Sequence, residues 1–376
     1  MTFKLSDICT FADGRIAVAD LDLNNYISTE NMLQNKEGIT RSAGLPTVNQ
    51  TQAYQAEDVL VSNIRPYFRK IWYADRDGGC SNDVLVFRAK ENVYPNFLYY
   101  LLSDNTFFDY ATATAKGTKM PRGDKGAIMR YEVPDLPLDI QIGIADTLAA
   151  LDARIAENRA INNHLEQMAQ AIFKSWFVDF DPFADGEFTE SELGTIPAGW
   201  QVDRIGDLPV TVTDYVANGS FASLKENVTL LESPDYAVFV RNVDLKAGSF
   251  GKFVDEHSYH FLSKSALFGG EVIISNVGDV GSVFLCPYLS QPMTLGNNMI
   301  MLTANKRKEH NYFFYLLFKH SYGAELIRSI TGGSAQPKFN KTDFRSLRVV
   351  MPPFEVMDKF LETVECLFER QSELEQ

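Results

Sequence analysis

An internal repeat constrains this chain of 376 residues more than any other feature. The segment Asp-Val-Leu-Val-Ser-Asn at 58–63 returns as Glu-Val-Ile-Ile-Ser-Asn at 271–276, an offset of 213 residues. Asn-Phe-Leu-Tyr-Tyr-Leu-Leu at 96–102 returns as Asn-Tyr-Phe-Phe-Tyr-Leu-Leu at 311–317, an offset of 215. Two further pairs keep the same order, 82–87 with 297–302 and 136–140 with 352–356. Ordered repeats of this length indicate two copies of one domain.

Each copy has the sequence pattern of a mixed α+β domain. A helix is predicted near 95–110 in the first copy and near 311–328 in the second, each followed by a loop with Gly and Lys. Short runs of β-branched and aromatic residues bounded by Gly, Asn, Asp or Pro are typical of strands. These runs are 59–62, 84–87, 236–240, 272–275 and 299–302. We therefore expect two α+β globules.

An amphipathic helix is predicted after each globule. In the first helix the apolar residues fall on alternating steps of three and four over roughly 35 residues, the pattern of a coiled-coil seam. They are Ile144, Leu148, Leu151, Ile155, Leu165, Ala169, Ile172 and Trp176. Asn158 and Asn162 fill the two remaining seam positions, where polar side chains fix register and weaken packing. The pattern returns at Phe360, Val364, Leu367 and Leu374. The alternative interpretation is an ordinary amphipathic core helix.

Composition excludes several classes of protein. The four cysteines lie far apart without a CxxC pair, which favours reduced thiols over a metal site or disulfides. The chain has neither a run of about 18 apolar residues nor the start of a signal peptide, so we expect a cytoplasmic protein without a membrane partner. It also lacks the GxxxxGK[ST] phosphate-binding loop.

The net charge of −14 argues against a nucleic-acid ligand, because proteins that bind DNA usually present a basic surface. Two arrangements would remove the conflict. Acidic residues can be confined to helices and outer surfaces, as in the segment 365–375, while the DNA-facing loops stay locally basic. A partner chain can also supply contacts to the phosphates.

The segment 136–162 resembles the central conserved region of specificity subunits of type I restriction–modification systems. The segment 165–182, which ends Ser-Trp-Phe-Val-Asp-Phe-Asp-Pro, is closely similar to the same region. Gly-Thr-Ile-Pro-Ala-Gly-Trp at 194–200 also resembles this family. The resemblance implies an α+β fold with two repeated target-recognition globules. Long helices that form an antiparallel coiled coil would separate the globules, with a pseudo-two-fold axis between them.

The resemblance also implies domain boundaries. The target-recognition domains would span 1–137 and 184–353, the central conserved helix 138–183 and the C-terminal conserved helix 354–376. With an offset of 216, the C-terminal helix stops at the counterpart of residue 160. The helical pair is therefore expected to be either lopsided or completed by another chain.

A specificity subunit of this family has no catalytic activity and reads the two halves of a split site in double-stranded DNA. It recruits two methyltransferase subunits and, for cleavage, motor–nuclease subunits. The resemblance implies that this chain binds no cofactor directly, and that S-adenosylmethionine is bound by the methyltransferase. Two alternatives remain open, an acidic scaffold or DNA mimic and a metal-dependent nuclease.

Two short motifs superficially suggest enzymes. Met351-Pro-Pro-Phe354 is similar to an adenine-methyltransferase motif but has a thioether where that chemistry needs a carboxamide or carboxylate. Asp235 followed by Asp244 and Lys246 resembles a nuclease site, although such spacing is common by chance. We expect both segments to be structural.

Two loops of each globule are candidates for DNA contact. In the first globule they are 62–70, after a strand, and 116–122, after the helix; their counterparts begin at 275 and 331. Lys and Arg could contact phosphate or guanine, and Asn and Gln could pair with adenine. The candidates are Ser62, Asn63, Arg65, Tyr67, Arg69, Lys116, Thr118, Lys119, Arg122, Ser275, Asn276, Ser334, Gln336, Lys338 and Asn340. The alternative is that these are ordinary solvated loops.

An aromatic cluster ends the first long helix. Phe173, Trp176 and Phe177 are followed closely by Phe180 and Phe183. The cluster could form a hydrophobic joint between the helix and the second globule, or it could bind a methyltransferase subunit. Both interpretations are carried forward.

Overall fold

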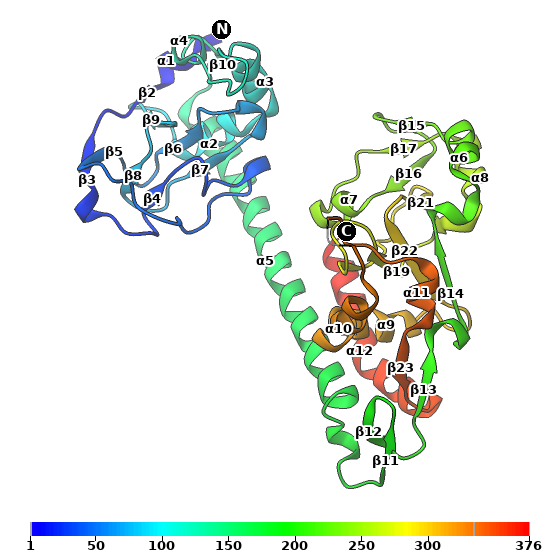
Figure 1. The fold of residues 1–376 in the computed structure, drawn as a ribbon. Coiled ribbons are helices and arrows are strands. Elements are labelled where there is room, and N and C mark those ends of the chain that lie inside the picture. Colours follow the sequence, from blue (N-terminus) through cyan, green and yellow to red (C-terminus); the bar gives the residue numbers. More distant parts are fainter. Residues whose placement is uncertain (1, 334, 376) are drawn as a thin grey trace. The chain divides into compact units, whose positions relative to one another are not determined.

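The fold is given by a computed structural model that describes residues 2–333 and 335–375 (Figure 1). The chain divides into two compact units between Ala156 and Glu157. This division falls inside a single helix, α5 (Leu138–Phe177). Each unit is described by itself. The boundaries predicted for the four domains stay a prediction, although α5 begins at the residue predicted for the central helix.

The first unit contains two small sheets and a strand pair. One sheet is antiparallel, in the order β2 (Cys9–Phe11), β9 (Val84–Ala89), β6 (Val59–Ser62) and β7 (Ile71–Tyr73). The other has the order β3 (Arg15–Ala17), β5 (Gln50–Tyr54), β8 (Gly78–Cys80) and β4 (Tyr26–Ile27), with β4 parallel to β8. The strand β1 (Thr2–Lys4) pairs with β10 (Glu132–Pro134).

The second unit repeats this plan. Its antiparallel sheet has the order β14 (Val210–Asp214), β22 (Met299–Ala304), β19 (Val272–Ser275) and β20 (Val283–Leu285). Its second sheet has the order β15 (Leu230–Leu231), β17 (Phe253–Val254), β16 (Ala237–Val240), β21 (Met293–Leu295) and β18 (Ala266–Leu267), with β16 parallel to β21. The strand β13 (Gln201–Arg204) pairs with β23 (Arg348–Met351), and β11 (Phe188–Ser191) with β12 (Gly194–Pro197). The repeat predicted from sequence is confirmed.

In the four-stranded antiparallel sheet of each unit, one inner strand is buried on both faces: β6 in the first unit and β19 in the second. In β6, Val59 and Val61 enter one core while Leu60 enters another. In β19, Ile274 likewise enters one core while Ile273 enters another. Because side chains alternate along a strand, two covered faces require an uninterrupted apolar run. This requirement explains why these two segments gave the clearest strand prediction.

Each predicted helix after the strands is in fact two helices. The first copy has α2 (Pro95–Ser103) and α3 (Asn105–Ala113), and the second has α9 (His310–Lys319) and α10 (Ser321–Ile330). Asp104 and His320 are extended, with φ near −65°, and each side chain accepts a hydrogen bond from the backbone two residues later. A side chain that caps a new helix interrupts the old one. Gly323 lets α9 and α10 pack closely, because a Cβ there would lie 2.0 Å from the Leu317 carbonyl oxygen.

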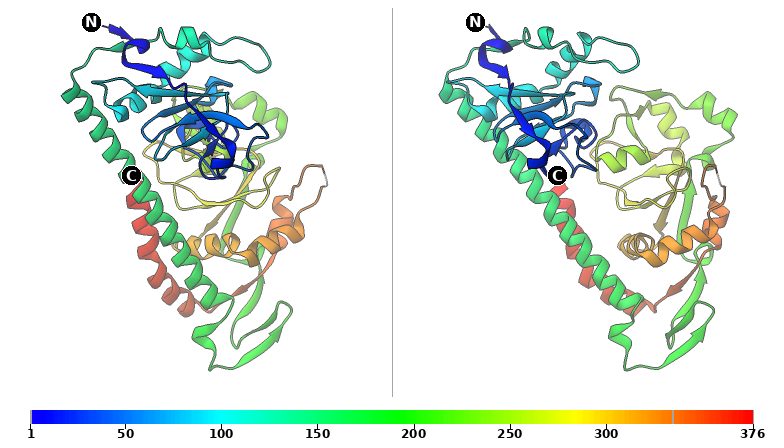
Figure 2. Two further views of the ribbon diagram at one scale, coloured as in Figure 1. Left: turned by 90° about the vertical axis from the view of Figure 1, so that its left-hand side faces the viewer. Right: turned by 60° about the vertical axis from the view of Figure 1, so that its left-hand side comes forward.

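The second half of α5 runs antiparallel to α12 (Phe354–Glu375), as Figures 1 and 2 show. Asn158 Nδ2 donates to Leu374 O at 3.3 Å, and Gln371 Nε2 donates to Asn162 O at 3.0 Å. The Phe360 ring lies 5.9 Å from Trp176. The predicted antiparallel helical pair and the two repeated globules are therefore confirmed.

The helical pair is lopsided. At 1.5 Å per residue α5 is about 60 Å long and α12 about 33 Å, so α12 reaches only the second half of α5. Among the described residues no helix covers the seam before Asn158. Ile144 and Leu148 are 38% and 37% exposed, and Leu151 and Ile155 are 56% and 50% exposed. The seam predicted over roughly 35 residues is thus paired only from Asn158 onward.

The opposite side of this first half packs within the first unit. Ala145 is fully buried, and Gln141 Oε1 accepts a hydrogen bond from the Tyr94 backbone at 3.0 Å. The Tyr100 hydroxyl donates to Asp152 at 2.8 Å. One side of the helix is therefore fixed to its globule while the apolar seam faces outward.

Candidate nucleic-acid interface

The two loops predicted to contact DNA are brought together in each unit by matching bridges. In the first unit Arg122 bridges both Ile64 and Lys116. In the second unit Lys338 bridges both Val277 and Gly332. Both backbone hydrogen bonds of the Lys116–Arg122 bridge, 2.8 and 2.9 Å long, recur in the Gly332–Lys338 bridge, where both are 2.9 Å. The loop pair is therefore a repeated structural element.

An asparagine anchors each loop pair, buried in the first unit and half-buried in the second. The Asn63 backbone N–H donates to Asp83 O at 2.8 Å, and Asn63 O accepts from Gly123 N at 3.1 Å. Asn276 makes the equivalent backbone bonds, and its Nδ2 also donates to Phe339 O at 3.1 Å. Gly123 permits this contact, because a Cβ there would lie 2.8 Å from Asn63 Oδ1. The asparagine at this position holds the loops against the end of the sheet.

Burial separates the candidate residues into two sets. Ser62, Asn63 and Ser275 are buried, and Asn276 is half-buried. Their burial argues against direct DNA contact by Ser62 and Ser275 and against the pairing with adenine predicted for Asn63 and Asn276. Ser62 and Ser275 are the last residues of β6 and β19, which are enclosed on both faces, and the two asparagines follow directly at the root of the loops.

The remaining described candidates lie at the surface. Arg65 and Arg69 are half-buried. The exposed candidates are Tyr67, Lys116, Thr118, Lys119, Arg122, Gln336, Lys338 and Asn340. Asn340 also caps α11 (Lys341–Ser346), where its Oδ1 accepts from Asp343 N at 2.9 Å. Ser334 lies outside the described residues.

The loop 62–70 has a strained backbone. Arg65 and Arg69 are both left-handed, with φ of 50° and 51°, on either side of the turn Pro66–Phe68. Such conformations cost about 1 kcal/mol or more for residues other than glycine and concentrate at functional sites. In the second unit the corresponding loop uses Gly278 and Gly281 for its positive φ angles. Tyr67, at the tip of the first loop, is 49% exposed.

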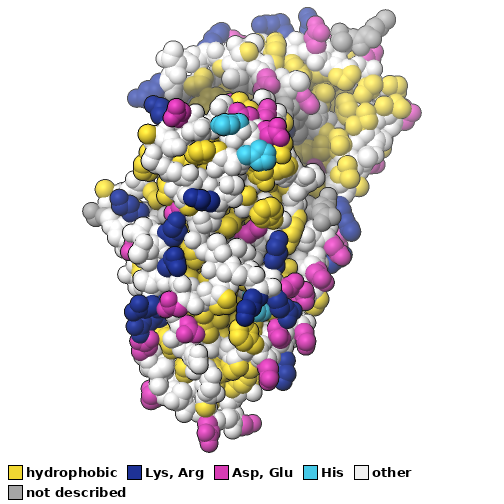
Figure 3. Space-filling view, turned by 90° about the vertical axis from the view of Figure 1, so that its right-hand side faces the viewer, with side chains coloured by type: hydrophobic (Ala, Val, Ile, Leu, Met, Phe, Trp, Pro, Cys, Tyr) yellow, Lys and Arg dark blue, Asp and Glu magenta, His cyan; other side chains and the backbone are white. Residues whose placement is uncertain are grey.

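Carboxylates accompany the cations of the first loop pair. Arg122 lies 3.0 Å from Asp83, and Arg69 lies 3.4 Å from Asp109. Lys116 pairs with Asp124 and is the main cause that lowers the pKa of this carboxyl to about 2. Exposed ion pairs contribute about 0–1 kcal/mol, so a phosphate could replace these carboxylates. On the face shown in Figure 3, which turns the right-hand side of Figure 1 and its second unit toward the viewer, Lys and Arg are likewise interspersed with Asp and Glu.

The suspected nuclease residues do not converge. Asp244 is buried and accepts hydrogen bonds from the Arg241 guanidinium at 2.6 and 2.8 Å. Lys246 pairs instead with Asp279 at 2.6 Å. Within 2–333 and 335–375, no three His, Cys, Asp or Glu side chains are grouped so that they could hold a metal ion. Met351 ends β23 and Phe354 begins α12, so the Pro-Pro motif forms a strand–helix junction.

The aromatic cluster lies in the core of the second unit. Phe173 and Phe177 are 1% and 9% exposed, and the Phe177 ring lies 4.7 Å from Phe360 and 5.0 Å from Phe313. Trp176 is half-buried against the same core. This burial favours the hydrophobic joint. Direct binding of another subunit by Phe173 and Phe177 does not fit it, because both rings are enclosed by their own chain.

Comparison with known proteins agrees with two copies of one α+β domain joined by long helices. A family described as the type I restriction modification DNA specificity domain matches residues 1–167 and 197–376. The chain therefore belongs to this family.

The matching relatives include two curated proteins. The chain is 27% identical over 289 residues to the type I restriction enzyme MjaIX specificity subunit of Methanocaldococcus jannaschii, covering 75% of this chain and 64% of that protein. It is 24% identical to the type I restriction enzyme HindI specificity subunit of Haemophilus influenzae, covering 92% of this chain and 88% of that one.

The fold also matches a solved structure. The crystal structure of a type I restriction–modification system S subunit from M. genitalium aligns with a TM-score of 0.54 and 15% identity. The alignment covers 100% of this chain and 90% of that one. In the described part of the chain, no helix combines the length and apolarity needed to cross a bilayer.

Proposed function

We propose that this chain reads both halves of a bipartite site in double-stranded DNA and has no catalytic activity of its own. The observation that carries the proposal is the repeated loop pair. The same two loops are joined by the same bridges at Arg122 in one unit and at Lys338 in the other. The exposed side chains on these loops differ between the units, as two different half-sites would require.

The proposal includes methyltransferase partners. Two methyltransferase subunits would bind the chain and supply S-adenosylmethionine, and motor–nuclease subunits would join for cleavage. The outward seam at Ile144, Leu148, Leu151 and Ile155 supports such binding, because an exposed apolar stripe costs free energy unless a partner covers it. The partners would also supply part of the phosphate contact that a chain of charge −14 lacks. Strong, salt-sensitive DNA binding by the isolated chain would argue against this last point.

The experiment that tests the function is co-expression with a candidate type I methyltransferase subunit from the same genome, followed by mapping of modified adenines across the host genome. We expect a split motif, with two short defined halves around an undefined gap. A stable complex without any motif would contradict the proposal and favour the acidic scaffold or DNA mimic. Metal-dependent cleavage by the purified chain would instead favour the nuclease.

A further inference from the structure

A segment that the sequence did not indicate lies against the first DNA-facing loop in the first unit. It follows β4 and includes the turn Gln34–Lys36. The Lys36 backbone N–H donates to Arg69 O at 2.9 Å, and Lys70 Nζ donates to Thr29 O at 2.6 Å. Lys36 is left-handed like Arg69, with φ of 67°. The two cations are therefore held side by side by their backbones.

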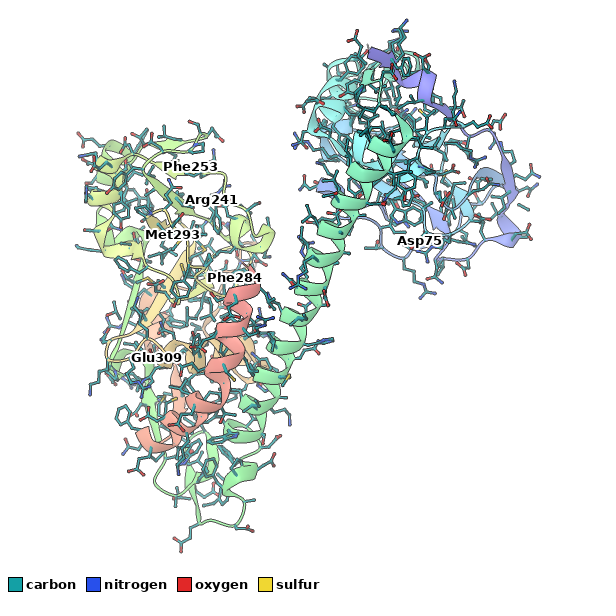
Figure 4. All side chains as sticks on the ribbon, turned by 180° about the vertical axis from the view of Figure 1, so that it is seen from behind. Asp75, Arg241, Phe253, Phe284, Met293 and Glu309 are labelled. Carbon is teal, nitrogen blue, oxygen red and sulfur yellow. The ribbon has the colours of Figure 1, made fainter. Side chains whose placement is uncertain are left out.

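The equivalent segment occupies the same place in the second unit. It follows β16, which is parallel to β21 as β4 is to β8, and it forms the helix α7 (Asn242–Ala247). Asn242 Nδ2 donates to Asp279 at 3.0 Å, and Lys246 pairs with the same carboxylate at 2.6 Å. Asp279 belongs to the loop after β19. Figure 4 shows Arg241, directly before α7, in the lobe that carries Phe253 and Met293.

One hydrogen bond near the start of the segment recurs in both copies. The Ser28 backbone N–H donates to Asn31 Oδ1 at 2.6 Å. The Arg241 backbone N–H, 213 residues later, donates to Asp244 Oδ2 at 3.1 Å. Both copies therefore fold the segment after the parallel strand against the loop that follows β6 or β19, although the two sequences share little.

The chemistry of the segment suits a DNA ligand. Burial and the neighbouring Arg69 both lower the pKa of Lys36, and Asp104 opposes this change. Asp109, the carboxylate paired with Arg69, is 70% exposed, so the cation pair is only partly neutralised. On α7, Val243 is 59% exposed and Lys246 48% exposed, and their spacing of three residues places them on one face.

We propose that this segment is a third DNA-contacting element in each unit, beside the two loops. Lys36 and Arg69 together hold one phosphate in the first unit. In the second unit Lys246 contacts the backbone with its remaining N–H donors, and Val243 makes an apolar contact in a groove. This inference rests on the proposed DNA-reading function. A segment that only braces the loop would leave DNA binding unchanged when the half-buried Lys36 or the exposed Val243 is truncated.

The first test compares Lys36→Ala with Lys90→Ala in the complex with the methyltransferase. Lys90 is the control, because it belongs to the same unit and follows β9 at the end opposite to Asp83 and the loops, where its Nζ donates to Ser6 O at 2.6 Å. The probe is a random-sequence duplex of roughly 40 base pairs, titrated from about 50 to 200 mM salt. We expect Lys36→Ala to weaken binding about threefold to tenfold and to reduce the salt slope by about 0.9, with no change for Lys90→Ala.

Arg122→Ala serves as the reference for the proposed function, and its binding is measured with a duplex that carries the methylated motif. Wild-type binding by Lys36→Ala, together with weakened binding by Arg122→Ala, would overturn the third element and leave the loop pair intact. Wild-type binding by both variants would overturn the proposed function as well. Equal weakening by Lys36→Ala and Lys90→Ala would also overturn the inference, since a general charge effect would then explain the loss.

The second test uses Val243→Ser with Val216→Ser as its control. Val216 is 45% exposed and lies in the turn Tyr215–Asn218, which packs beside α6 (Phe221–Asn227). Adenine methylation is mapped for each complex. We expect Val243→Ser to relax or change a base in one half-site only, and Val216→Ser to keep the wild-type motif. An unchanged motif for Val243→Ser would overturn the groove contact.

Discussion

Arg122 and Lys338 occupy equivalent positions, and the backbone of each forms the bridge between its two loops. Substitution by Ala keeps that bridge and removes only the exposed cation. We expect Arg122→Ala to reduce discrimination against a duplex whose first half-site is scrambled, and Lys338→Ala to do so for the second. A base-specific contact of Arg or Lys is worth about 1–3 kcal/mol, or roughly fivefold to 150-fold in affinity.

The measurement is fluorescence anisotropy of the methyltransferase complex with the intact site and with each half scrambled separately. Each variant serves as the control of the other. Loss of discrimination at the same half-site in both variants would contradict the assignment of one half-site to each unit.

His320 gives the second unit a predictable dependence on pH. Its Nδ1 accepts the N–H of Tyr322 at 3.2 Å and so caps α10 only while the ring is neutral at that atom. Burial, followed by the nearby Lys174, lowers the pKa of His320. Burial and Arg307 likewise lower the pKa of His310. The folded unit therefore takes up protons less readily than the unfolded chain.

A lowered folded-state pKa means that stability is full above the unfolded pKa of about 6.5 and falls as pH drops below it. We expect the urea midpoint of the second unit's transition to decrease between about pH 7 and pH 5. His320→Asn retains a capping side chain and removes the titration, so it should reduce this decrease. The same decrease in the variant and the wild type would contradict the role of His320.

At the scale of elements, the sequence correctly predicted the strands whose position depends only on the local pattern of apolar residues. The strands at 59–62 and 272–275 are as predicted because both faces of each are enclosed. The helix near 95–110 was wrong as a single element, because Asp104 caps a second helix and nothing in the apolar pattern marks the break. The sequence also did not predict that the first half of the seam is unpaired, because apolar periodicity does not show how far the partner helix extends.

In the candidate site, too, some features were predicted from the sequence and others required the structure. The two loops were recognised from their cations and glycines, but the bridges between them join residues about 60 positions apart in sequence and required the fold. The burial of Asn63 could not be predicted, because a polar residue at a strand end is usually exposed. The segment at Lys36 gave no signal because its counterpart, α7, has a different sequence and a different local structure.

The joint between α5 and the second globule can be tested directly. Phe177 is enclosed by Phe313, Phe360 and Trp200, so Phe177→Ala should destabilise the second unit by about 3–5 kcal/mol. Leu151→Ala, at a residue 56% exposed, should change stability by less than about 0.5 kcal/mol. Denaturant unfolding monitored by tryptophan fluorescence measures both.

Binding to the methyltransferase distinguishes the outward seam at Leu151 from the aromatic joint at Phe177. Leu151→Ala should weaken the complex while the isolated chain stays folded, because the proposed partner covers the outward seam. An unchanged unfolding transition in Phe177→Ala would contradict the joint and return the aromatic cluster to the partner interface.

At the scale of the whole molecule, one continuous helix joins two units that otherwise have separate cores. The chain divides between Ala156 and Glu157, where α5 leaves the first unit and begins to pair with α12. Asp152 on α5 accepts the Tyr100 hydroxyl of the first unit, and Asn158 donates to Leu374 on α12 in the second. The division between the two units lies between these contacts, so an insertion there lengthens α5 between the two cores.

This arrangement predicts that α5 sets the gap between the two half-sites. Insertion of four helix-forming residues after Ala156 lengthens the helix by about 6 Å. At about 3.4 Å per base pair, the undefined gap in the methylated motif should grow by roughly one or two base pairs while both half-sites stay the same. A four-residue insertion in the exposed turn between β11 and β12 is the control and should leave the gap unchanged. Methylation mapping measures both, and an unaltered gap in an active α5 variant would show that α5 does not set the spacing.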